Sequence, residues 1–362
     1  GRMDRVQLER REDSGRSYFR YRGEWFTLDS TADEETTRRC VVRVVQVFRA
    51  YRQVLPPREI ETDAQPDKPL RVLLLASMDE YQAFLDEHDL SVTNPALYSQ
   101  QGNLIVAASE LTRYAARLET ARGRHDEIRQ RYEQLDRQLS ERLAELRRQL
   151  TSAGVSRDAI DDEINARKSQ WQAEYVETIQ QLNAADRRNE RRFHEVTDEM
   201  FGRLYHEAFH AYLENYLYPH KQYDVPIWLH EGLAQLFQSG RLEGDRLRID
   251  APLASALQTV QDDLRGSSPI ALDELLSATR RDFVSGEAAS GRSDRLYAHA
   301  WALSYYLAFY HPVLGTEALN EFVAAARNNQ TPQERFAELI AMPTANFETQ
   351  FHSAMLSVRR PR

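Results

Sequence analysis

The spacing of apolar residues changes several times along the chain and separates it into three parts. Residues 17–29 alternate apolar and polar positions on both sides of a glycine, which predicts a β-hairpin. Residues 33–53 change to a repeat of three or four, as on one face of an amphipathic helix. Short apolar runs at 70–77 and 103–109 predict buried strands. Residues 1–109 are therefore expected to form a small α+β subdomain.

Residues 110–198 have the pattern of two long helices, with two glycines, no proline and one polar turn at 151–158. Before the turn, apolar residues step by three or four from Ile128 to Leu150. After the turn they recur every 11 residues, at Ile160, Trp171, Leu182 and Phe193. Such a repeat has about 3.67 residues per turn, which suits a nearly straight or slightly right-handed coiled coil. The pattern predicts an inserted antiparallel helical hairpin.

Acidic and basic residues are mixed along this helical hairpin. The simplest interpretation is two solvated faces around one apolar seam. Docking of a protein partner is the alternative, because a helix of about 40 residues is roughly 60 Å long and projects from a domain body.

The third part, residues 199–362, is expected to be mainly helical. Amphipathic helices are predicted at 199–218 and 226–237, with several more towards the C-terminus. Small polar residues at 285–294 predict a mobile loop. The predicted fold class is therefore α+β, with the helical hairpin inserted between the N-terminal subdomain and a helical C-terminal part.

Composition excludes several classes of protein. The chain has 362 residues, of which 41% are hydrophobic and 28% charged, and no apolar run is long enough to cross a membrane as a helix. A net charge of −9, with both signs interspersed, argues against a nucleic-acid-binding face. The single cysteine, Cys40, excludes an intrachain disulfide and a cysteine-based zinc cluster. The compartment stays open, and removal of a signal segment ahead of Gly1 would favour a secreted or cell-envelope location.

The stretch LYHEAFHAYL, residues 204–213, contains two histidines four residues apart, with a glutamate directly after the first. Residues four apart lie about 40° apart around a helix axis, so His206 and His210 can face one ion. Zinc favours imidazole ligands, and Glu207 would then lie beside the metal as a general base. An ordinary helix surface with two histidines is the alternative, and this motif alone does not decide between them.

A catalytic zinc site needs a third protein ligand. The candidate is Glu231, 21 residues after His210, in the segment WLHEGLAQLF. The apolar side of this segment predicts a second helix packed on the first, and Gly232 would allow the two helices to approach closely. His230 is expected to point away from the metal. His206, His210 and Glu231 are therefore the predicted metal ligands.

The motifs HEAFH and WLHEGLA resemble those of the gluzincin metallopeptidases, in the peptidase-MA-like superfamily, and most of all bacterial zincin-like families that are largely uncharacterised. The resemblance covers residues 1–109 and 199–350. It implies a zincin-like fold with Zn²⁺ as cofactor and Glu207 as the catalytic base. It also implies a mixed N-terminal sheet whose edge strand, here 103–109, lies above the metal and can pair with an extended peptide.

One position departs from this resemblance. Some gluzincins have an acidic residue four positions after the glutamate ligand, where this chain has Gln235. The usual acidic partner that orients a ligand histidine is therefore not identified from the sequence.

The resemblance further implies a tyrosine or histidine that stabilises the oxyanion formed during hydrolysis. The segment RLYAHAW, which follows the predicted mobile loop, offers both residue types. Tyr297, at the start of a helix, is the first candidate, and His299 is the alternative.

These observations predict a zinc-dependent hydrolase of protein or peptide substrates. An endopeptidase is preferred to an aminopeptidase, because no motif for an acidic pocket that would bind a substrate amine is found. The alternative is a zinc-stabilised, non-catalytic binding or scaffold protein that acts through the helical hairpin. The intact Glu207 favours the enzyme, since a purely structural site needs no base beside the metal.

Overall fold

The computed structural model describes residues 3–13, 16–61, 64–90, 92, 94–243, 246–284, 291–324 and 330–359. The chain divides into two compact units, a larger one of residues 1–109 with 199–362 and a smaller one of residues 110–198. Of the loop predicted at 285–294, residues 285–290 lie outside the described part, and Arg292 already begins a helix.

The larger unit contains a six-stranded sheet in the order β1-β2-β3-β4-β6-β5. The strands are β1 (Glu9–Asp13), β2 (Arg16–Arg22), β3 (Thr27–Ser30), β4 (Arg71–Leu75), β5 (Ala96–Ser99) and β6 (Leu104–Ala108). The pairs β3–β4 and β4–β6 are parallel and the other pairs are antiparallel, so the predicted mixed sheet is confirmed. The predicted hairpin at 17–29 is β2 with β3, and the two apolar runs are β4 and β6.

The edge of this sheet differs from the prediction. The run at 103–109 was expected at the edge, but β6 lies between β4 and β5, and β5 is the edge strand. Four of the five residues of β6 are buried, as expected for a strand covered on both faces. β5 is only four residues long and has one buried residue, which suits an edge position.

Helices make up most of the remaining described chain. In order they are α1 (Glu34–Val54), α2 (Met78–Glu87), α3 (Leu111–Ser152), α4 (Arg157–Tyr216), α5 (Ile227–Gln238), α6 (Ala254–Arg265), α7 (Leu272–Ser277), α8 (Arg280–Val284), α9 (Arg292–Phe309), α10 (Glu317–Ala324), α11 (Pro332–Ile340) and α12 (Thr344–Ser357). A 3-10 helix, η1 (Met3–Arg5), precedes β1, and a small hairpin of β7 (Arg241–Glu243) and β8 (Arg246–Arg248) follows α5. The mainly helical C-terminal part is confirmed. None of the described helices is both long and apolar enough to span a membrane.

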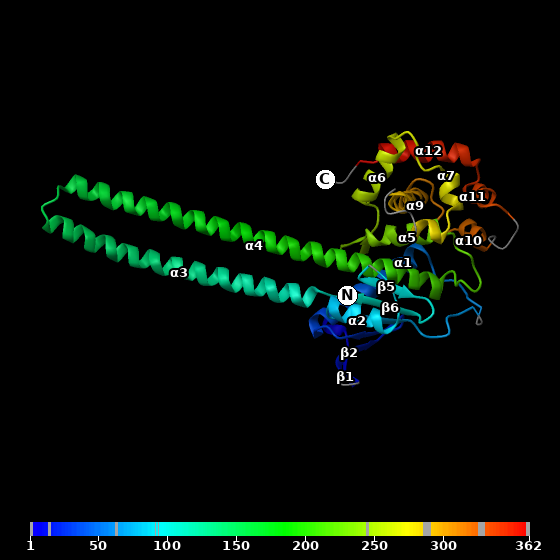
Figure 1. Ribbon diagram of the computed structural model, residues 1–362, viewed down its shortest axis with the longest axis horizontal. Coiled ribbons are helices and arrows are strands. Elements are labelled where there is room, and N and C mark those ends of the chain that lie inside the picture. The colour runs from blue at the N-terminus through cyan, green and yellow to red at the C-terminus, as the bar shows by residue number, and fades with distance from the viewer. Residues whose placement is uncertain are drawn as a thin grey trace. The chain divides into compact units, whose positions relative to one another are not determined.

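In the smaller unit, α3 and α4 lie side by side as the predicted helical hairpin (Figure 1). Ion pairs of 2.7 Å join Arg122 to Glu190 and Arg147 to Asp161, which is the order of an antiparallel pair. Trp171 of the predicted seam stacks on a tyrosine of α3, with ring centroids 5.5 Å apart.

α4 is longer than the sequence pattern suggested. A separate helix was expected to begin at residue 199, but α4 runs unbroken over 60 residues and ends at Tyr216. Residues 157–216 contain no proline, so the backbone can keep its helical hydrogen bonds through the expected boundary.

The last four turns of α4 are held against α1 by aromatic packing and buried hydrogen bonds. The Tyr51 ring of α1 meets that of Tyr212 at a centroid distance of 5.3 Å. Tyr51 Oη donates to the Tyr205 carbonyl at 2.6 Å, and Tyr212 Oη donates to the Leu55 carbonyl at 2.7 Å. These bonds fix both the position and the rotation of the helix that carries the two histidines.

α5 packs closely on α9 at Gly232. A Cβ atom at this glycine would lie 2.2 Å from the Ala300 carbonyl oxygen and 2.3 Å from Ser304 Oγ. The close approach that Gly232 permits is therefore with α9, not with the histidine-bearing helix as the sequence suggested. α9 is buried on nearly all sides, so it is a rigid wall behind α5.

We expect Gly232→Ala to destabilise the larger unit by about 1–3 kcal/mol or more, because the new methyl group overlaps backbone atoms of α9. Chemical denaturation followed by circular dichroism measures the change. Gly123→Ala is the matched control: it lies within α3, where the added Cβ has no atom within 4 Å apart from the adjacent backbone of its own helix, and should stabilise that helix by up to about 1 kcal/mol. Equal stability of the Gly232→Ala variant and the unchanged protein would contradict this packing.

Candidate metal centre

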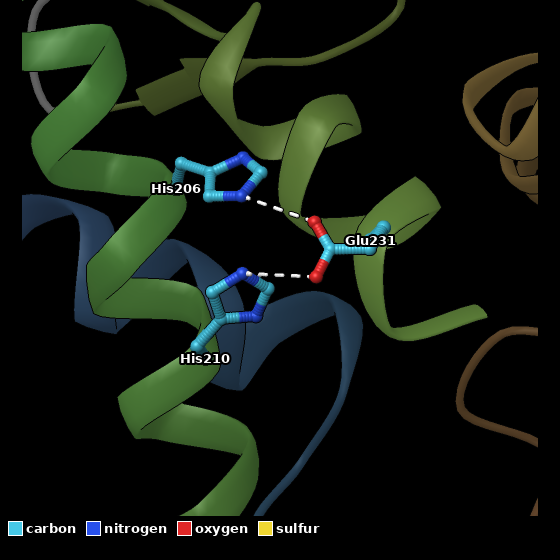
Figure 2. Close-up of side chains that lie close together, drawn as sticks. All are labelled: His206, His210 and Glu231. Atoms are coloured by element: carbon cyan, nitrogen blue, oxygen red, sulfur yellow. Dashed lines mark ion pairs between the residues drawn. The ribbon is translucent and has the colours of Figure 1, made fainter. Parts of the chain in front are cut away.

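His206 and His210 of α4 face Glu231 of α5 (Figure 2). His206 Nε2 lies 3.4 Å from Glu231 Oε2, and His210 Nε2 lies 3.7 Å from Glu231 Oε1. The two imidazole planes are nearly perpendicular, at 89°. One ligand atom from each of the three residues lies within 4.8 Å of the others. The structure thus brings together the three residues that the sequence suggested as ligands.

These separations suit a single metal ion. Two donors that are each about 2.0–2.1 Å from a tetrahedral ion are about 3.4 Å from one another. The histidine-to-carboxylate distances of 3.4 and 3.7 Å are close to this value. The group could therefore bind a metal ion through two imidazole nitrogens and one carboxylate oxygen.

Burial and the opposite charges within the group determine its protonation. Burial disfavours the charged form of Glu231, yet the hydrogen bond from His206 and the charge of that ring hold its pKa well below the ordinary value. Burial lowers the pKa of His210 well below its ordinary value, so this ring is neutral, as metal binding requires. Burial opposes the charged form of His206 too, but the hydrogen bond to Glu231 raises its pKa overall.

A neutral amide orients one of the ligand histidines. Gln238 Oε1 lies 3.0 Å from His206 Nδ1, so this nitrogen donates and Nε2 faces Glu231. Gln238 follows Glu231 by seven residues, two helical turns later on the same face of α5. Gln235, in the position where an acidic residue was expected, donates instead to the Tyr297 carbonyl at 3.1 Å. Gln238 was not predicted from the sequence, because only an acidic partner was expected. The seven-residue spacing between Glu231 and Gln238 is the signal that could have identified it.

His230 lies beside the group and does not point away from it as the sequence suggested. Its ring stacks on the His210 ring, with centroids 4.2 Å apart and planes 8° apart. His230 Nδ1 also lies 3.5 Å from Glu231 Oε1. Among the described residues, the buried Nδ1 atoms of His210 and His230 have no hydrogen-bond partner, so ring stacking holds this side of His210.

Glu207 is half-buried and directly follows His206 in α4. Burial raises its pKa to about 7. The backbone N–H of Tyr98, in the edge strand β5, partly offsets this rise, because it favours the charged form of the Glu207 carboxylate. Glu207 therefore neighbours both the ligands and the edge of the sheet.

The two candidates for oxyanion stabilisation have different surroundings. Tyr297 lies near the ligand group, where burial and then the charge of Glu231 raise its pKa to about 12. Its hydroxyl therefore stays protonated at neutral pH and can donate. His299 is buried, and its Nε2 lies 2.8 Å from Asp263 Oδ2 of α6. Asp263 thus engages the Nε2 atom of His299, which favours Tyr297 as the candidate donor.

We expect Gln238→Leu to weaken Zn²⁺ or Co²⁺ binding by about 10–100-fold, because His206 loses the acceptor that sets its tautomer and orientation. Competition with a chromogenic chelator measures the affinity. Gln235→Leu is the matched control, since its amide bonds to the Tyr297 carbonyl and not to a ligand. Unchanged affinity in the Gln238→Leu variant, or equal losses in both variants, would contradict the role of Gln238.

A comparison with protein families matches part of the chain. A family described as "Protein of unknown function (DUF1570)" matches residues 201–332. This range includes His206, Glu207, His210, Glu231 and Tyr297, whereas the six-stranded sheet and the helical hairpin lie almost wholly before it. A search of curated proteins finds no match. The match therefore covers the helices of the candidate metal centre and attaches no activity to them.

Proposed function

We propose that the protein is a zinc-dependent peptide-bond hydrolase of the gluzincin type, acting as an endopeptidase. The observation that supports it most is the half-buried carboxylate of Glu207 directly beside a group of three potential ligands. Structural zinc sites usually have four protein ligands, whereas three ligands leave a position for water. A base beside that open position is what hydrolysis requires.

Zinc is the metal we propose, because two imidazoles and one carboxylate are a ligand set typical of its catalytic sites. When bound, zinc activates water and polarises the scissile carbonyl. Glu207 accepts a proton from the attacking water and later delivers it to the leaving amine. Tyr297 donates its phenolic proton in a hydrogen bond to the oxyanion that develops on the carbonyl.

The edge strand β5 is the surface that we propose for the peptide. In an antiparallel pair, alternate residues turn their backbone groups away from the partner strand. The Ala108 N–H bonds to the Pro95 carbonyl, so the backbone groups of Ala96 and Tyr98 face away from β6. We expect an extended peptide that added to this edge to lie next to Glu207, since the Tyr98 N–H favours the charged form of that carboxylate.

A zinc-stabilised binding protein that acts through the helical hairpin is the second candidate. Ile128, Val155 and Val176 of the hairpin are 36%, 38% and 49% exposed, and a docked partner would cover such side chains. The two candidates differ in their need for Glu207, which only the hydrolase requires.

We expect Glu207→Gln to retain zinc and to lose hydrolysis of a diverse peptide library by about 100-fold or more, because glutamine cannot accept the proton of water. Metal analysis and mass spectrometry of the cleaved library measure the two properties. Glu195→Gln, an exposed glutamate of α4, is the matched control and should hydrolyse normally. Unchanged turnover in Glu207→Gln would exclude the mechanism, and no turnover in the unchanged protein would favour the binding-protein alternative.

We expect Tyr297→Phe to lower kcat by about 10²–10³-fold with little change in KM, because the donor acts mainly on charge that develops in the transition state. Steady-state kinetics on a peptide from the same library measures both constants. Tyr305→Phe, on the same helix, removes a hydroxyl that bonds to the Asp250 carbonyl at 2.9 Å and should leave kcat unchanged. A kcat for Tyr297→Phe equal to that of the unchanged protein would remove Tyr297 from the mechanism.

A further inference from the structure

A reciprocal pair of asparagine side chains joins the sheet to the histidine-bearing helix. Asn103 Nδ2 donates to Asn215 Oδ1 at 2.8 Å, and Asn215 Nδ2 donates back to Asn103 Oδ1 at 2.9 Å. The second hydrogen of each amide is also used, by the Lys68 carbonyl at 2.6 Å and the Ala211 carbonyl at 2.8 Å. Asn103 is only 1% exposed, so these bonds replace water and fix both side chains.

The backbone conformation of Asn103 favours this contact. Asn103 ends the turn between β5 and β6 with a φ of 43°, in the left-handed region that asparagine tolerates better than most residues. Its Oδ1 accepts a second hydrogen bond from the Tyr98 hydroxyl at 2.9 Å. One amide oxygen therefore binds the edge strand β5 and α4 at the same time.

A second contact ties the same turn to α4. Gln100 Nε2 donates to Glu214 Oε2 at 3.0 Å, and Glu214 is itself buried and bonded to His220. The turn is thus attached to α4 at two adjacent helix positions, Glu214 and Asn215. Because these positions lie about two turns beyond Glu207, they set how β5 lies along the helix that carries the base.

We propose that Asn103 and Asn215 are positioning residues, which fix β5 against α4 so that the Tyr98 N–H holds one oxygen of Glu207 and leaves the other for water. This proposal rests on the function proposed above. The Tyr98 N–H faces away from β6, so it can serve Glu207 without a loss of pairing within the sheet. The edge strand then orients the base as well as offering backbone groups to a peptide.

Hydrogen exchange of the Tyr98 amide tests the contact without any need for catalysis. In Asn215→Leu, which removes the reciprocal pair, we expect this amide to exchange about tenfold faster, as for a lost hydrogen bond. Tyr216→Phe is the matched control, since the adjacent side chain loses a 2.9 Å bond to the Trp25 carbonyl but has no link to β5. Unchanged exchange in Asn215→Leu, or equal acceleration in Tyr216→Phe, would overturn the proposal.

Kinetics tests the consequence for the base. We expect Asn215→Leu to lower kcat by about 10–100-fold with unchanged zinc affinity, and Asn215→Asp, which keeps the acceptor for Asn103, to recover part of that loss. Tyr98→Phe removes only the phenol bond and should act in the same direction if Asn215→Leu does not fold. A normal kcat in both Asn215→Leu and Tyr98→Phe would overturn the positioning role. Absence of hydrolysis in the unchanged protein would instead count against the proposed function, while the exchange result would still decide whether the pair holds β5.

Discussion

The charge of Glu231 is buried between two imidazoles, and this burial constrains the packing of three helices. A carboxylate in such surroundings is stabilised only while its partners stay within a few ångströms, and loss of one partner from a buried pair costs about 3–5 kcal/mol. His206 and His210 meet this condition from α4, at 3.4 and 3.7 Å. α9 supports this arrangement from the other side of α5, because its backbone packs against Gly232, the residue next to the buried carboxylate. The site is therefore a property of how α4, α5 and α9 pack together.

Each potential ligand is held on more than one side. Gln238 accepts from the nitrogen of His206 that faces away from Glu231. His230 covers the face of the His210 ring and also approaches Glu231. The α1–α4 contact adds hydrogen bonds from tyrosine hydroxyls to backbone carbonyls, which resist rotation of α4 about its axis. Such support preorganises donors that would otherwise repel one another or turn towards solvent.

The sequence predicted those parts of the structure that depend on local spacing. The 3.6-residue repeat was enough to place His206 and His210 on one face, and the apolar side of 226–237 was enough to predict a helix that brings Glu231 to them. Parts that depend on contacts between distant segments were missed. Neither the α9 partner of Gly232 nor the stacking of His230 has a local signal, because the contacting residues are far apart in the chain or depend on a side-chain rotamer. The run at 103–109 was wrongly expected at the edge of the sheet, because the resemblance implied an edge strand there. Its continuous apolar pattern is instead typical of an inner strand, which β6 is.

Two parts of the site are encoded far apart. The potential ligands lie at residues 206–231, inside the range matched by the family of unknown function, whereas β5 comes before the helical hairpin and outside that range. β5 affects the charge of Glu207 through a backbone N–H, which any residue other than proline supplies. Apart from Tyr98, whose hydroxyl bonds to Asn103, the side chains of β5 can therefore vary without changing the atoms that act on the base. This separation makes the edge strand a practical region for altering substrate preference by protein engineering while the ligand set stays intact.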